Sequence, residues 1–77
     1  MKFRLHTVWL RESKEILKKY PTLKEFSIET VGDNLYITLK DLEDLTKLSA
    51  KYGEIILSSE NSIYGEPTIE IYDDYRE

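Results

Sequence analysis

The residue best suited to catalysis is the single histidine, His6. Histidine titrates near neutral pH, so it can act as a general base toward a serine or threonine hydroxyl within its reach. The serines that cluster are Ser58, Ser59 and Ser62, and their segment lacks the glycine pattern of a nucleophile elbow. An outward-facing position on a strand explains His6 without catalysis. We therefore expect no catalytic residue and no enzymatic activity.

Carboxylates are the other groups that could do chemistry, because a chain with one histidine and no cysteine can build a metal site only from Asp and Glu. Asp41, Glu43 and Asp44 form a cluster at the start of a predicted helix, where acids stabilise the positive end of the helix dipole. Asp73 and Asp74 lie in the C-terminal tail, where solvation accounts for them. We expect no metal site. The three glycines are too widely spaced for a phosphate-binding loop, so we also expect no cofactor.

The composition is that of one small folded domain. Leu, Ile, Val and Phe account for 22 of the 77 residues, a fraction above that of disordered, charged chains. No apolar run approaches the roughly 18 residues that a membrane span needs. We expect a soluble, cytoplasmic α+β domain over residues 1–72, followed by an acidic tail, residues 73–77.

Charge is distributed unevenly along the chain. Residues 1–24 carry seven basic and two acidic side chains. Residues 25–65 carry three basic and eight acidic side chains, and residues 66–77 carry one basic and five acidic side chains. The blocks therefore have net charges of +5, −5 and −4, and the total of −4 hides a dipolar arrangement.

Two segments are predicted to be helices. The first spans residues 14–20, with Ser13 as its N-cap and Pro21 ending it. The second follows Asp41, another good N-cap, and ends at Gly53. Its apolar residues recur at helical spacing: Leu42, Leu45, Leu48 and Tyr52.

Five segments have the alternation or the short apolar run of a strand: residues 2–10, 26–31, 35–40, 54–58 and 68–72. The second and third flank Gly32-Asp33-Asn34, which predicts a β-hairpin.

The order β-α-β-β-α-β indicates a ferredoxin-like (split β-α-β) sheet with two helices on one face, and the fifth strand is an extra C-terminal one. We expect the inner face of the sheet to hold the apolar positions of the strands: Phe3, Leu5, Trp9, Phe26, Ile28, Leu35, Ile37, Leu39, Ile55, Leu57, Ile69 and Ile71. The alternative is that residues 54–72 form a separate β-arm.

The sheet face opposite the helices is the first candidate binding surface. Strand parity places basic and aromatic residues there: Lys2, Arg4, His6, Tyr36 and Lys40. An aromatic ring among cations is how RNA-binding sheets stack bases and neutralise phosphates. Glu29 and Glu70 share this face, and the isoelectric point is near 5.0, which argues against binding a polyanion.

The same face could instead bind a protein partner, because protein–protein interfaces are enriched in aromatic residues and arginine. Two such faces could also stack back to back in a homodimer. Ile63 and Tyr64 form an apolar pair in a polar loop, and the tail interleaves aromatic and acidic residues from Tyr72 onward.

The sequence thus predicts a non-enzymatic macromolecule-binding protein: a regulator, adaptor or inhibitor of the kind that phages and mobile elements encode. The expected partner is another protein or a second copy of the chain. Single-stranded nucleic acid is the alternative, and no membrane is involved. The predicted contact residues are Arg4, His6, Tyr36, Lys40, Ile63, Tyr64, Tyr72, Asp73, Asp74 and Tyr75.

Overall fold

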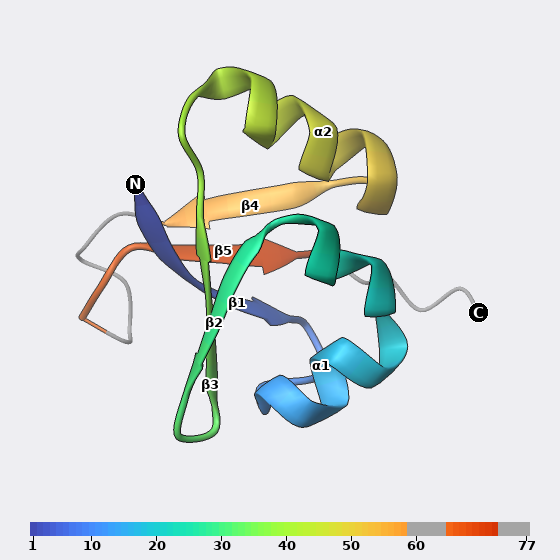
Figure 1. Ribbon diagram of the computed structural model, residues 1–77, viewed down its shortest axis with the longest axis vertical. Helices are drawn as coiled ribbons and strands as arrows, with labels where there is room; N and C mark the ends of the chain where they lie inside the picture. Colours follow the sequence, from blue (N-terminus) through green and yellow to red (C-terminus); the bar gives the residue numbers. More distant parts are fainter. Residues whose placement is uncertain (59–64, 73–77) are drawn as a thin grey trace.

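A computed structural model describes residues 1–58 and 65–72 and contains a five-stranded sheet with two α-helices (Figure 1). In chain order the elements are β1 (Lys2–Thr7), α1 (Ser13–Lys19), the 3₁₀ helix η1 (Pro21–Glu25), β2 (Ser27–Val31), β3 (Asn34–Thr38), α2 (Leu42–Tyr52), β4 (Ile55–Ser58) and β5 (Thr68–Ile71). The mixed α+β organisation predicted from the sequence is confirmed.

Helix α2 begins and ends at the predicted residues. The Asp41 carboxylate accepts hydrogen bonds from the backbone N–H groups of Glu43 and Asp44, at 3.0 and 3.2 Å. Gly53 follows the helix with a φ of 87°, a conformation that glycine adopts without strain.

The predicted cap of the first helix is wrong. Glu12 is the N-cap of α1 and makes no side-chain capping bond, whereas Ser13 is the first helical residue and is buried. The Ser13 N–H donates to the carbonyl of Asp33 at 2.8 Å, so the β2–β3 turn satisfies a group at the start of this helix. Pro21 does end α1, and it opens η1.

The sheet order is β2-β3-β1-β5-β4. Residues Gly32 and Asp33 connect β2 to β3 as a two-residue hairpin, as predicted. Both β4 and β5 belong to the main sheet, so the separate β-arm is not formed by the described residues. Strand β5 lies between β1 and β4, parallel to β1 and antiparallel to β4. The sheet thus differs from the expected one, in which the fourth strand would lie directly beside the first.

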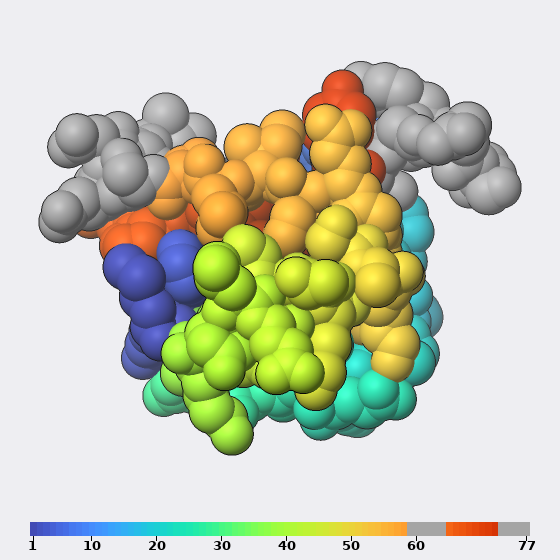
Figure 2. Space-filling view, turned by 90° about the horizontal axis from the view of Figure 1, so that it is seen from above, coloured from blue at the N-terminus to red at the C-terminus, as the bar shows by residue number. Residues whose placement is uncertain are grey.

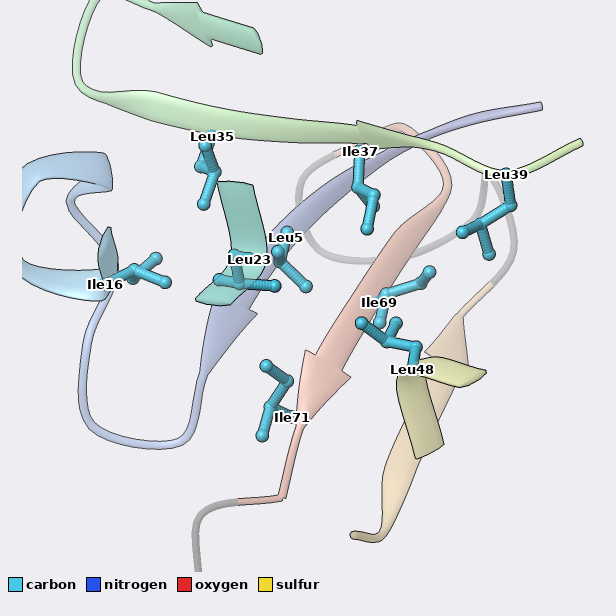
Figure 3. Packing of buried hydrophobic residues seen from close by; sticks show 9 residues of the cluster. All are labelled: Leu5, Ile16, Leu23, Leu35, Ile37, Leu39, Leu48, Ile69 and Ile71. Atoms are coloured by element: carbon cyan, nitrogen blue, oxygen red, sulfur yellow. The ribbon is translucent and has the colours of Figure 1, made fainter. Parts of the chain in front are cut away.

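The core lies between the sheet and the helices (Figure 3). Its nine buried side chains come from three strands, from the residue after β3, and from α1, η1 and α2: Leu5, Ile16, Leu23, Leu35, Ile37, Leu39, Leu48, Ile69 and Ile71. Ten of the twelve predicted inner-face residues belong to this cluster or pack against it.

Trp9 and Leu57 are the two exceptions, since they are 58% and 49% exposed. Strand β1 ends at Thr7, whose hydroxyl accepts hydrogen bonds from the N–H groups of Trp9 and Leu10, so the chain turns before the alternation reaches Trp9. Leu57 has the predicted parity but lies on the edge strand β4. Leu42, the first residue of the predicted α2 stripe, is 78% exposed.

Candidate functional site

The open face of the sheet brings together three of the predicted contact residues. Arg4 of β1 lies opposite Tyr36 of β3, and His6, two residues further along β1, lies opposite Glu70 of β5. Alternation along the strands directs these side chains away from the helices. The sequence prediction that Arg4, His6 and Tyr36 share a face is confirmed by this register.

Acidic side chains pair with the cations of this face. The Lys2 ammonium lies 3.2 Å from the Glu29 carboxylate, and the Arg4 guanidinium lies 3.6 Å from that of Glu66. The Tyr36 hydroxyl donates to both Glu66 oxygens, at 3.2 and 3.1 Å. Burial and this Glu66 carboxylate raise the pKa of Tyr36.

The aromatic ring of the face is also engaged. The Lys2 ammonium lies 4.9 Å from the centroid of the Tyr36 ring, within the range of a cation–π contact. A nucleic-acid base could stack on the Tyr36 ring only by displacing the Lys2 ammonium. Lys2 and Arg4 would each have to break an ion pair with a carboxylate before they could bind a phosphate. The face is therefore close to neutral and largely satisfied within the protein.

His6 is on this face but is only 5% exposed. Its Nδ1 lies 3.0 Å from the Thr7 carbonyl oxygen, 3.4 Å from the Arg11 guanidinium and 3.8 Å from the Glu70 carboxylate. Burial lowers the pKa of His6, and the positive charges of Arg11 and Arg4 act in the same direction. His6 is therefore neutral at pH 7, and its side chain is buried among its neighbours on this face and is not presented to solvent.

Arg11 reaches His6 because the chain turns after β1. Its guanidinium donates to the carbonyl oxygens of Thr7 and Val8, at 2.7 and 3.2 Å. These bonds hold a positive charge against the end of β1. Sequence parity did not include Arg11 in the face, because it lies beyond the strand.

Lys40 does not join the other predicted residues, because β3 ends at Thr38. It lines a cleft of about 550 Å³ between α2 and the start of β2. Lys47 and Lys51 line the same cleft, and the Lys51 ammonium pairs with the Glu25 carboxylate at 2.5 Å. This hydrogen bond raises the pKa of Lys51.

Tyr72 follows β5 and is 40% exposed. Its N–H donates to the Glu54 carbonyl oxygen at 2.9 Å. The remaining predicted contact residues lie outside the described residues: Ile63, Tyr64, Asp73, Asp74 and Tyr75.

A second surface was not predicted from the sequence, and it lies where α2 runs beside the edge strand β4 (Figures 1 and 2). A groove of about 500 Å³ separates the helix from the strand, and none of the described residues that line it is charged. The lining residues are Leu45, Thr46, Ser49, Ala50, Ile55 and Leu57. Leu42, at the first turn of α2, is 78% exposed, and Ile56, whose side chain lies on the open side of β4, is 39% exposed. We call the groove with these two residues the α2–β4 surface.

Helix α2 divides its side chains between its two flanks. Asp44, Lys47 and Lys51 line the cleft toward β2, whereas Leu45, Thr46 and Ser49 line the groove toward β4. The 3.6-residue period places these two sets on opposite sides of Leu48, which points into the core. The flank toward β4 thus has the composition of a contact surface.

The backbone of β4 directs some of its hydrogen-bonding groups to its outer side, away from β5. Because the Tyr72 N–H bonds to the Glu54 carbonyl, the antiparallel alternation directs the backbone groups of Ile56 and Ser58 toward β5. Those of Ile55 and Leu57 therefore point to the outer edge, where none of the described strands pairs with them. Lysine, proline and bulges usually protect such an edge, and residues 55–58 contain none of them.

The signal for this surface is present in the sequence. Ile55, Ile56 and Leu57 are consecutive, so both faces of the strand are apolar where alternation would leave one face polar. Whether such a strand is central or at an edge depends on strand order.

Within residues 1–58 and 65–72, no group of three or more His, Asp or Glu side chains is arranged to hold a metal ion. No helix in the described part of the chain is long and apolar enough to cross a membrane. Comparison with protein-family models, with curated proteins and with solved structures finds no match to this chain.

Proposed function

We propose that the chain is a non-enzymatic protein-interaction module, a small adaptor or regulator, and that the α2–β4 surface is its binding site. The observation that supports this proposal is an uncharged edge strand, with outward-directed backbone groups, beside an apolar groove. Exposed edges of this kind are usually blocked in monomeric proteins. An unblocked edge next to a groove fits a site that another chain covers.

The binding mode follows from the geometry. An extended segment of the partner adds as a sixth strand beside β4 and bonds to the outward N–H and C=O groups of Ile55 and Leu57. Its alternate side chains enter the groove beneath α2. Covering Leu42 and Leu57 contributes to affinity, since a fully buried leucine side chain is worth about 1.5–3 kcal/mol. The backbone bonds supply affinity and the groove supplies selectivity for apolar side chains.

We also infer that the sheet is a ferredoxin-like sheet with one inserted strand. Without β5 the order would be β2-β3-β1-β4, the split β-α-β arrangement. The insertion moves β4 one place outward, and this position accounts for the exposure of Leu57. Strand β4 is at the edge in either order, and the inserted strand moves this edge one place away from β1.

Single-stranded nucleic acid at the open face is the competing function. The adjacency of Arg4 and Tyr36 favours it, but Glu29, Glu66 and Glu70 neutralise the same face. Binding there would have to break pairs that the protein already makes, so we place the function at the α2–β4 surface.

The test is selection of peptides from a displayed random library, with counter-selection against Leu57→Lys. We expect peptides with alternating apolar residues that bind the wild type and the Val31→Lys variant equally and lose at least about tenfold in affinity for Leu57→Lys. Val31 is the matched control because it is 48% exposed, like Leu57 at 49%, and lies on the opposite edge strand. Bound peptide should protect the Ile55 and Leu57 amides from hydrogen exchange.

With monomeric protein, failure to recover such peptides contradicts the proposal. Recovery of peptides that contact Arg4 and Tyr36 instead also contradicts it. Salt-dependent retention of random single-stranded RNA that is lost in Arg4→Glu would transfer the function to the open face.

A further inference from the structure

We infer that the chain covers the α2–β4 surface with a second copy of itself, in a symmetric dimer joined through antiparallel β4 strands. This inference rests on the proposed function, whose site it uses, and it names the partner. The dimer would contain one continuous sheet of ten strands, five from each copy.

The backbone sets the register of this contact. The outward groups belong to Ile55 and Leu57, so a two-fold axis at Ile56 places Ile55 of each copy opposite Leu57 of the other. Both members of each pair direct their side chains toward the helix side of the sheet, and both are apolar. Ile56 meets Ile56 of the second copy on the open side of the sheet.

The helices then become neighbours across the axis. A two-fold axis perpendicular to the sheet keeps both α2 helices on the same face and makes them antiparallel. Their facing flanks carry Thr46 and Ser49, which are small enough to allow close approach, and no charged residue lines these flanks. Leu42, exposed at the first turn of each helix, is directed toward the groove of the second copy.

The helix dipoles of α2 suit this antiparallel arrangement. The charged residues at the two ends of the helix do not take part, because Asp44 and Lys51 line the cleft toward β2 and Lys51 is paired with Glu25. The dipoles of the two helices run in opposite directions across the axis, so the positive end of each lies beside the negative end of the other. The antiparallel dipoles therefore add to the contact along the uncharged flank.

The back-to-back dimer expected from the sequence is less favourable on the same grounds. Stacking two open faces would bury Lys2, Arg4 and Glu66, and buried ion pairs regain little of their desolvation cost. Edge pairing leaves this network in water.

A single cysteine tests the register, because the chain has no cysteine of its own. Directly opposed residues of a pair that is not hydrogen-bonded have Cα atoms about 4.5 Å apart, within the range that a disulfide spans. Under mild oxidation Ile56→Cys should therefore form a covalent dimer rapidly. Val31→Cys, at the other edge of the sheet, should remain a monomer under the same conditions.

Sedimentation equilibrium over about 1 μM to 1 mM tests the association itself. We expect wild type and Val31→Lys to dimerise alike. Leu57→Lys should raise the dissociation constant at least about tenfold, because it buries a charge against Ile55 of the second copy. A wild type that is monomeric throughout this range, or a dimer that survives Leu57→Lys while Ile56→Cys fails to cross-link, overturns the inference.

The two proposals fail separately. A monomer that still binds selected peptides at β4 refutes the second copy and leaves the protein-interaction site standing. A monomer that binds no such peptide refutes both.

Discussion

At the scale of single residues, the most unusual group is the buried His6. It is surrounded by the side chains of Arg11, Glu70 and Arg4 and by the Thr7 carbonyl. Burial and two arginines disfavour its protonated form more than Glu70 and the carbonyl favour it, so the pKa of His6 in the folded protein lies below its ordinary value of 6.5. The unfolded chain therefore binds this proton more tightly than the folded one.

This difference predicts a pH dependence of stability. The contribution of neutral His6 is complete above pH 6.5 and decreases as the pH falls from 6.5 toward the folded-state pKa. The free energy of unfolding of the wild type, measured with urea, should decrease as the pH is lowered from about 7.5 to 5.5, a range above that in which carboxylates titrate. His6→Gln, which cannot titrate, should show a flatter profile. Parallel profiles of the two proteins would contradict the assignment.

At the scale of elements, helix α2 has a buried side and an exposed flank. Leu48 lies on the buried side and Leu42 on the exposed flank, although both belong to the same apolar stripe of the sequence. Leu48 is 0% exposed and Leu42 is 78% exposed. Leu48→Ala should lower the free energy of unfolding by about 2–5 kcal/mol through lost burial and a cavity. Leu42→Ala should change it by about 0.5 kcal/mol or less when measured on the monomer.

Chemical denaturation of both variants in the Leu57→Lys background measures this difference without a contribution from association. Equal losses for the two leucines would mean that the helix packs in a different rotation from that described.

The helical spacing in the sequence predicted α2, its cap and its last residue correctly, because these features depend on neighbours within a few positions. The same spacing could not say which residues of the stripe are covered. Leu42 has the period of a core residue, and only the position of α2 on the sheet leaves it in solvent.

At the scale of the whole molecule, the placement of β5 determines the architecture. Strand β5 pairs with β1 on one side and β4 on the other, and its Ile69 and Ile71 are 0% and 1% exposed. An inserted central strand cannot be removed without separating its two neighbours.

Truncation tests this position. A chain ending at residue 66 should lose its cooperative unfolding transition, because β4 then has no partner and the core loses two fully buried isoleucines. Full-length Ile69→Val should remain folded, with a loss of about 0.5–1.5 kcal/mol. Circular dichroism during thermal unfolding distinguishes these outcomes. A truncated chain that still melts cooperatively would place β5 at a dispensable edge.

The sequence by itself determined the two α-helices, the five strands and most of the core, because alternation, helical spacing, Asp41 and the Gly32 turn are local signals. It did not predict η1 or the cap of α1. It also placed Arg4, His6 and Tyr36 on one face, since parity along a strand needs no knowledge of its neighbours. The tertiary structure alone decided that Glu66 neutralises this face, that His6 is buried, and that Lys40 lies elsewhere. It also decided that β5 enters the sheet beside β1 and leaves β4 at the edge. Strand order depends on contacts between residues far apart in the chain, and the apolar edge beside α2 is a consequence of that order.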